Sequence, residues 1–481
     1  MPYTSLEFAV FLAAVVVGYH GCPLRWRRGY LLVASYAYYC AWSIRFGVLL
    51  LAVSWVAYWI GGRIATSPDP NRRYAYVWTG VVLLLMPLLA FKYVGGLEAM
   101  TGWLAGSTVG AALVAQFAGA VGISYYTLKL ISYVVDVYWE RQAPCGSFAS
   151  VATYAAFFPQ ILSGPIQRAG DFLDQIESPA RPRPAVVISG MQLILFGLFK
   201  KLVLADRLGV LVDQVFAEPR AFSGGVVALA AYLFAIQLYA DFSGLTDIAI
   251  GMARLFGIQS PPNFDSPYYA ENMQEFWRRW HMTLTTWLRD YLFTPLRMAL
   301  RDRGQLGLIV SLAVNMVAIG VWHGPRLTFA AFGVLHAVYL IGSSLSLRAR
   351  TKWLRARPAL SRLHALVGPL VTFNMVVVSF VFFRAGSVAD AWQVFRRAGS
   401  VLTGARGTGF GALAWGPADV AVAVFALIVM EAIHLLRHRR QLSGLIHRMP
   451  AWARWTAYCA LGFTILLWGE SGSTQFIYVR F

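Results

Sequence analysis

The chain has 481 residues, of which 58% are hydrophobic and only 13% are charged. Its many apolar runs approach the roughly 20 residues that an α-helix needs to cross a bilayer, which excludes an ordinary soluble protein and favours a multi-pass membrane protein. The formal net charge of +19 is better explained by basic cytoplasmic loops than by nucleic-acid binding.

The apolar runs predict membrane-spanning helices, because lipid does not tolerate unpaired backbone amides and the alternation typical of barrel strands is absent. We expect about ten to twelve crossings, since several runs are short enough to be re-entrant or interfacial. The first run has no basic segment before it, so we interpret it as a retained span and not as a signal peptide. The candidate runs are 5–20, 30–43, 46–62, 76–92, 106–122, 123–139, 186–205, 224–240, 306–322, 327–346, 365–383, 416–436 and 452–469.

The order of these runs predicts one integrated all-α membrane domain. Basic clusters follow the first and third runs, and the positive-inside rule then places both loops in the cytoplasm and the N-terminus outside. We divide the domain into N-terminal spans (1–140), a catalytic core with broken helices (141–346) and C-terminal spans (347–481).

Polar chemistry is concentrated between roughly 157 and 336, where "FFPQILSGPIQR" (157–168) and "DFSGLTDIAIG" (241–251) interrupt apolar sequence. Broken backbone at membrane depth is tolerated only when it is buried in protein or lines a wet cavity. We therefore expect a water-accessible chamber inside the bundle. Asp241 should pair with a buried Arg or Lys, because an unpaired carboxylate there is costly. The cysteines show no metal-ligand spacing, and we expect no metal site.

The segment "WRRWHMTLTTWLRDYLFTPL" (277–296) holds His281, the first candidate histidine. One interpretation is an interfacial helix, with its tryptophans at the headgroups, its arginines snorkelling and His281 on the polar side. The alternative is that this helix lines the chamber and His281 faces the substrates. Arg289 and Asp290 are adjacent, so we expect each to pair with another residue.

His323 ends the run 306–322, and "HGPR" separates that run from the next one. Basic clusters flank the pair of runs, which predicts a helical hairpin with His323 at its turn, where Pro325 stops the helix. An ionisable residue there indicates function, although a histidine bonded to a backbone carbonyl is the structural alternative. A neutral imidazole can act as a general base. Because no G-x-S-x-G elbow is present, direct transfer from donor to acceptor is the simpler chemistry.

Two further histidines are interpreted as structural. His336 lies thirteen residues after His323, about 20 Å along a straight helix, so we expect it to pack and not to touch the same substrate atom. His434 follows Glu431 near the end of a span and precedes "RHRRQLSGLIHR". We interpret this region as a cytoplasmic basic anchor.

"EFWRRWHMTLTTWLRDYLFTPL" (275–296) followed by "VWHGPRLTFAAFGVLHAVYL" (321–340) resembles the membrane-bound O-acyltransferase family. The resemblance is strongest to its bacterial branch of alginate O-acetylation and teichoic-acid D-alanyl transfer proteins. "YYTLKLISYVVDVY" (125–138) and the terminal "FIYVRF" (476–481) match in order, so the resemblance extends over nearly the whole chain. Where relatives carry a glycine-rich stretch, this chain has "PLRMALRDRGQ" (295–305). This departure bears on the identity of the acyl donor, the acceptor or the partner protein.

The resemblance implies a helical bundle around a funnel, with His323 as the essential histidine and His281 as the second important one. It implies an O-acyltransferase of the cell inner membrane with no bound cofactor, acetyl-CoA as donor and an exported cell-envelope polysaccharide as acceptor. Its partners would be membrane lipid and periplasmic acetyltransferase proteins, and no nucleic acid. Candidate substrate-binding residues are Trp322, Gly324, Asn263, Arg279 and Asp290.

Two other functions are kept open. One is D-alanyl transfer from a carrier protein to teichoic acid, which the same branch of the family suggests. The other is a transporter without bond chemistry, because broken helices and intramembrane polar groups also suit transport.

Overall fold

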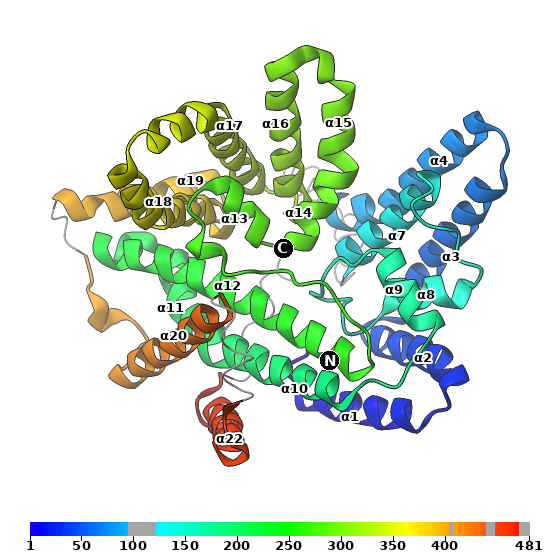
Figure 1. Cartoon of the computed structure of the whole chain (residues 1–481). Helices are drawn as coiled ribbons and strands as arrows, with labels where there is room; N and C mark the ends of the chain where they lie inside the picture. Colours follow the sequence, from blue (N-terminus) through cyan, green and yellow to red (C-terminus); the bar gives the residue numbers. More distant parts are fainter. Residues whose placement is uncertain (95–121, 404–406, 439–447, 471–481) are drawn as a thin grey trace, which may run out of the picture. The chain divides into compact units, whose positions relative to one another are not determined.

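The computed structural model describes residues 1–94, 122–403, 407–438 and 448–470 (Figure 1). In these ranges the regular structure is helical, and the one β-feature is an isolated bridge between Phe222 and Thr408. The all-α class is therefore confirmed.

Eight helices in the described ranges are long and apolar enough to cross a membrane, which confirms a multi-pass membrane protein. The predicted run 106–122 and the terminal motif at 476–481 lie outside the described residues, and the expected ten to twelve crossings stay a prediction. The eight candidates are Ile44–Thr66, Pro70–Tyr93, Pro184–Ala217, Gly224–Leu255, Arg301–His323, Leu327–Arg355, Pro358–Arg384 and Pro417–Leu436.

The helices group into two compact units, each described by itself. Unit 1 contains Met1–Ile194 and Leu245–Pro262, and unit 2 contains Leu195–Gly244 and Asn263–Phe481. The single integrated domain expected from the sequence stays a prediction.

Unit 1 is built around α3, α4 and α7, which pack against one another, with α8 against α2 and α3. The segment 157–168 is non-helical and almost entirely buried, so the predicted break is confirmed. Buried Lys129 donates to Gln160 at 3.1 Å, and Gln160 donates to Gln167 at 2.7 Å. Its helices are α1 (Leu6–Gly21), η1 (Leu24–Trp26), α2 (Arg27–Cys40), α3 (Ile44–Thr66), α4 (Pro70–Leu89), η2 (Ala90–Val94), α7 (Ile123–Tyr138), α8 (Phe148–Ala156), α9 (Ala169–Glu177) and most of α10 (Pro184–Leu198).

Unit 2 contains the predicted hairpin, formed by α16 and α17. A Cβ on Gly320 would meet the Phe329 carbonyl oxygen at 2.2 Å, and one on Gly333 would meet the Met316 carbonyl oxygen at 2.6 Å. The two helices therefore touch backbone to backbone, as small residues allow in membranes. The remaining helices are η3 (Phe199–Ala205), α11 (Asp206–Ala217), η4 (Pro219–Ala221), α12 (Gly224–Leu255, shared with unit 1), η5 (Pro267–Tyr269), α13 (Met273–Arg279), α14 (Met282–Leu288), η6 (Arg289–Phe293), α15 (Thr294–Ala299), η7 (Arg301–Arg303), α16 (Gly304–His323), α17 (Leu327–Arg355), α18 (Pro358–Arg384), α19 (Val388–Gly399), η8 (Ser400–Thr403), η9 (Phe410–Ala412), α20 (Pro417–His438) and α22 (Ala451–Trp468).

Helix α12 runs unbroken for 32 residues through the segment 241–251, so the break predicted there is wrong. Its carboxylate at Asp241 is satisfied from the neighbouring helix, where Lys201 Nζ lies 3.0 Å from Asp241 Oδ1 and 2.6 Å from Asp206 Oδ1. The π-helical turn η3 brings residues five apart onto one side, which lets Lys201 reach Asp206. The expected pairing of Asp241 with a buried cation is confirmed.

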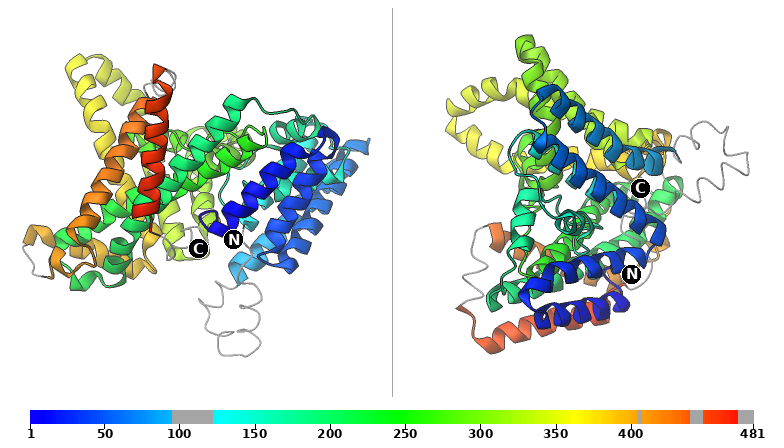
Figure 2. Two further views of the ribbon diagram at one scale, coloured as in Figure 1. Left: turned by 90° about the horizontal axis from the view of Figure 1, so that it is seen from below. Right: turned by 90° about the vertical axis from the view of Figure 1, so that its right-hand side faces the viewer.

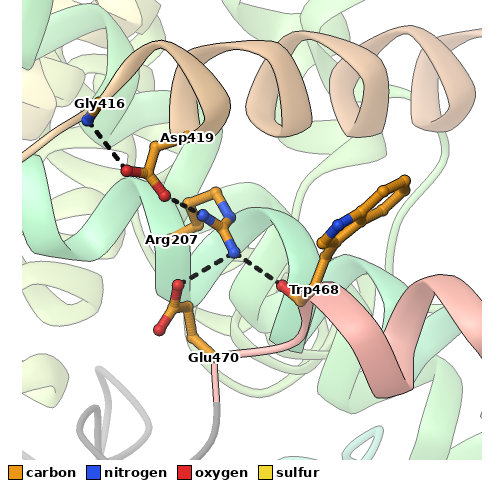
Figure 3. A network of polar contacts seen from close by, with 5 residues as sticks. All are labelled: Arg207, Gly416, Asp419, Trp468 and Glu470. Atoms are coloured by element: carbon orange, nitrogen blue, oxygen red, sulfur yellow. Dashed lines mark hydrogen bonds and ion pairs between the residues drawn. The ribbon is translucent and has the colours of Figure 1, made fainter.

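Arg207 joins three segments of unit 2 that are far apart in the sequence (Figure 3). Its guanidinium pairs with the Asp419 carboxylate at the start of α20 and lies 3.0 Å from a Glu470 carboxylate oxygen. It also donates to the Trp468 carbonyl at 2.8 Å, at the end of α22. Arg207 thereby fixes α11, α20 and the end of α22 to one another.

Candidate functional site

His323 is the last residue of α16 and lies at the predicted turn of the hairpin. Its side chain is buried, with 5% exposed, and it lies among aromatic rings from three helices of unit 2. The Phe383 ring of α18 is closest, with centroids 4.8 Å apart, the Trp322 ring of α16 follows at 5.0 Å, and Phe329 and Phe332 of α17 lie at 6.1 and 6.2 Å.

Gly324 follows His323 with an extended backbone (φ 163°) that any residue can adopt. The reason for glycine is steric: a Cβ would lie 2.9 Å from Cε2 of Phe329. Gly324 therefore lets an aromatic ring close against the turn beside His323.

His281 lies between two short helices and not within one. The chain breaks between α13 and α14, and His281 adopts a left-handed φ of 40°, which is uncommon for a residue other than glycine. The tryptophans of this segment, Trp277, Trp280 and Trp287, are all buried. The interfacial-helix interpretation of this segment is therefore wrong.

Asn263 holds this break in place. Its backbone carbonyl oxygen accepts a hydrogen bond from the Met282 N–H at 2.9 Å. Its side-chain Oδ1 accepts from the Thr283 N–H at 3.2 Å and from the Thr283 hydroxyl at 2.8 Å. These contacts satisfy N–H groups that the first turn of α14 would leave unpaired. His281 Nδ1 lies 3.0 Å from the same Oδ1.

These contacts define the tautomer of His281. A backbone N–H can only donate, so the bond from Thr283 identifies the Asn263 atom as the amide oxygen, which can only accept. His281 Nδ1 must then carry the proton, and Nε2 carries the lone pair. Nε2 is buried and has no hydrogen-bond partner within the described ranges. His281 thus offers one unprotonated nitrogen.

Trp322 contacts both candidate histidines. Its ring centroid lies 5.0 Å from that of His323 and 5.9 Å from that of His281, while Phe242 of α12 lies 4.7 Å from His281 on an edge-to-face contact. The structure therefore gathers His323, His281, Trp322, Gly324 and Asn263 into one cluster in unit 2. The predicted water-accessible passage to this cluster stays a prediction.

Arg279 and Asp290 make their ion pairs within their own segment. Arg279 lies 2.6 Å from Glu275, one turn earlier in α13. Arg289 Nε lies 2.9 Å from Asp290 Oδ1, so these neighbours pair with each other, and the other partner expected for each stays a prediction. Their proposed contacts with substrate stay predictions.

His336 forms a buried polar chain close to the cluster. The Trp277 indole N–H donates to His336 Nδ1 at 3.2 Å, which leaves the proton on Nε2 to donate to Ser379 Oγ at 2.9 Å. Ser379 in turn donates to the Val376 carbonyl at 2.7 Å. Both ring nitrogens are occupied by protein groups, as expected for a packing role.

His434 is buried, and most of the segment interpreted as a basic anchor (437–448) lies outside the described residues, so that interpretation stays a prediction. Its Nε2 lies 3.3 Å from the hydroxyl of Tyr239 on α12, and its Nδ1 lies 3.6 Å from Glu431. Tyr269 donates to the other Glu431 oxygen at 2.7 Å. Tyr239 and Tyr269 come from distant parts of the chain, so no local pattern pointed to this cluster.

Sequence reasoning also missed Phe383, Phe332 and Phe242, the aromatic residues around the two histidines. They occupy ordinary apolar positions in α18, α17 and α12, and nothing in the sequence separates them from other core residues.

Within the described ranges, no group of three or more His, Cys, Asp or Glu side chains is placed to hold a metal ion.

A helical, multi-pass membrane protein with a buried histidine pair is the class that the fold and this cluster define. Residues 141–378 match MBOAT, the membrane-bound O-acyltransferase family. The chain is 32% identical over 404 residues to the probable alginate O-acetylase AlgI of Pseudomonas aeruginosa, covering 82% of this chain and 74% of that protein.

Two other relatives carry related names. A peptidoglycan O-acetyltransferase of Helicobacter pylori is 29% identical over 394 residues, covering 76% of this chain and 72% of that protein. A teichoic acid D-alanyltransferase of Streptococcus thermophilus is 26% identical over 378 residues, covering 72% of this chain and 83% of that protein. The chain belongs to the membrane-bound O-acyltransferase family and is an O-acyltransferase, which confirms the resemblance found in the sequence.

Proposed function

We propose that this protein transfers an acetyl group from cytoplasmic acetyl-CoA to an exported cell-envelope polysaccharide, directly or through a periplasmic acetyltransferase partner, in the cell inner membrane. One observation carries the proposal: two buried histidines contact the same tryptophan, in a chain 32% identical to a protein named as a probable alginate O-acetylase.

The chemistry needs one proton to move. The acceptor hydroxyl gives its proton to neutral His323 while its oxygen attacks the thioester carbonyl carbon. The carbon–sulfur bond then breaks, the ester forms, and the imidazolium returns the proton to the leaving thiolate. His281 supports this step through Nε2, which can accept a hydrogen bond from the acceptor hydroxyl. Such positioned bases typically contribute about 100- to 10,000-fold.

The test separates the donors. Membranes containing this chain, with the remaining envelope enzymes present, are given either radiolabelled acetyl-CoA or a D-alanyl thioester of a carrier protein. We expect label in envelope polysaccharide from acetyl-CoA only. Label from the D-alanyl thioester alone would favour the second candidate, which the 26%-identical teichoic acid D-alanyltransferase suggests. Label from neither donor would contradict both proposed acyl donors.

Asn263→Asp is expected to shift the pH dependence of transfer. Burial lowers the pKa of His281, which lies outside the candidate spans, to about 3, so the ring is neutral at physiological pH. An aspartate keeps the acceptor oxygens but adds a negative charge 3.0 Å from Nδ1, which favours the imidazolium and raises that pKa. Because Nε2 acts only when unprotonated, the acid limb of the pH–rate profile should move to higher pH.

The profile is measured as transfer rate against pH in the same membranes, with Thr285→Val as control. The Thr285 hydroxyl donates to the Trp280 carbonyl at 3.1 Å in the same break, and the backbone N–H of Thr285, which the substitution keeps, donates to the His281 carbonyl at 3.0 Å. An acid limb that moves in neither variant would contradict the assigned role of Asn263. An equal movement in both would show that the change comes from a disturbed backbone.

A further inference from the structure

A groove of about 500 Å³ lies in unit 2 between α17, α18 and the start of α13. Figure 2 shows α17 and α18 (yellow) as a long hairpin. The α17 residues that line the groove extend from Val338 to Arg350 and those of α18 from His364 to Met375. These stretches hold thirteen and twelve residues of helix, which makes the groove about 17 Å long.

The groove changes character along its length. Arg350 and His364 lie at the end nearest the turn between α17 and α18, whereas Val338 and Met375 line the other end. Arg350 makes no ion pair or hydrogen bond within the described residues. The hydroxyl of Ser343, a lining residue in the middle, is buried and has no hydrogen-bond partner in the part of the chain that the structure describes. The groove therefore suits a ligand with a phosphate at one end, an ester in the middle and a hydrocarbon chain beyond.

The surface beside the groove faces hydrocarbon and not water. Both helices are candidate membrane spans, and the apolar side chains of Leu366, Leu370 and Val338 are 73%, 63% and 59% exposed. Such a surface is stable only in contact with lipid, so an occupant would enter from the bilayer.

The length and composition of α17 place the turn between α17 and α18 at the level of the lipid headgroups. Helix α17 has 29 residues, about 43 Å, against a hydrocarbon core of about 30 Å. Its excess length carries the basic sequence "RARTKWLRAR" (348–357), which contains no acidic residue. Trp353 is half exposed and Arg357 stacks 4.8 Å from its ring, as is typical of interfacial aromatic residues. Basic pockets between membrane helices bind lipid headgroups.

We propose that this groove is a phospholipid-binding site, with the lipid phosphate on Arg350 and His364 and one acyl chain between α17 and α18. The Ser343 hydroxyl is placed to donate to an ester carbonyl of that lipid. The site takes its ligand from the surrounding bilayer and does not depend on the proposed acyl transfer.

The test compares two double variants that remove basic side chains from inside and outside the groove. Arg350→Gln with His364→Gln removes the phosphate contacts. Arg348→Gln with Arg355→Gln is the control, because both residues line a separate notch of α17 and lie roughly opposite Arg350 on the helix. Delipidated protein in detergent is titrated with phosphatidylglycerol and phosphatidylethanolamine, and bound lipid is counted by native mass spectrometry.

Wild-type protein and the control should each retain one lipid with similar affinity. The groove variant should bind at least about tenfold more weakly, since a charged hydrogen bond to phosphate is worth about 1.5–3 kcal/mol. Equal loss in both variants would show diffuse attraction to the basic turn and overturn the site. Displacement of the lipid by inorganic phosphate alone would show an anion site that does not bind the acyl chain of a lipid. That result would also contradict the proposal.

A third variant tests whether the acyl chain of the lipid binds between α17 and α18. Gly342 lines the groove, and a Cβ there meets nothing within 4 Å, so Gly342→Phe places an aromatic side chain at the groove without a clash at its first carbon. Phenylalanine is a better helix former than glycine, and the fold should persist. We expect lipid binding to be lost while the thermal midpoint of delipidated protein is unchanged. Lipid retained by this variant would place the chain elsewhere and refute the proposal.

Discussion

Replacing His323 with glutamine is expected to abolish envelope O-acylation while leaving the protein in the membrane. Glutamine approximates the imidazole in size and polarity but cannot take a proton at neutral pH. Because general-base catalysis contributes about 100- to 10,000-fold, transfer should fall by that factor. The measurement is ester-linked acetate on envelope polysaccharide in cells whose own copy has been replaced by the variant.

His20→Gln is the matched control, since His20 lies at the end of α1 in unit 1 and bonds the Leu255 carbonyl at 3.0 Å. Its transfer should stay within about twofold of wild type. Immunoblots of the membrane fraction establish that both variants accumulate equally. Persistent acetylation by the His323 variant at wild-type levels would remove this residue from the mechanism.

Replacing Lys201 with methionine is expected to destabilise unit 2 severely. The ammonium lies within 3.0 Å of two carboxylates, Asp206 and Asp241, and all three side chains are at most 8% exposed. Removing one partner of a buried ion pair typically costs about 3–5 kcal/mol, because it leaves an uncompensated charge. Here two carboxylates would be left, so we expect loss of folded protein in fluorescence-detected size-exclusion chromatography after mild heating.

Two further variants show whether charge is the cause. Lys200→Met removes an ammonium that donates to Ser243 at 2.9 Å and leaves Lys201 with its two carboxylates, so its loss of stability should be clearly smaller. Adding Asp206→Asn and Asp241→Asn to Lys201→Met should recover most of the folded protein, since no net charge then stays buried. If that triple variant is as unstable as the single one, packing and not charge would explain the effect.

The location of His323 could be predicted from the sequence because the signals are local. Two apolar runs flanked by basic clusters define a hairpin, and a histidine followed by glycine and proline marks its turn. The pairing of Asp241 with a cation was predictable for a similar reason, since a lone carboxylate among apolar residues is too costly to stay unpaired. The identity of its partner, Lys201, was not predictable, because it is forty residues away on another helix.

His281 shows the opposite case. The segment around it has the composition of an interfacial helix, yet Asn263, eighteen residues earlier, satisfies the N–H groups of α14 and stabilises a break in the backbone. The same contact decides which imidazole nitrogen keeps the lone pair. The burial of His434 likewise depends on Tyr239, 195 residues away.

The sequence by itself determined that this chain is a helical membrane protein, which motifs it carries and where its hairpin turns, because hydropathy, helix-stopping residues and flanking charge act within a few residues of one another. The tertiary structure alone decided which side chains meet at the two histidines, which tautomer His281 adopts and where a groove opens between α17 and α18. Those outcomes depend on contacts between helices distant in sequence, and hydrogen-bond direction and packing exist only once such helices lie side by side.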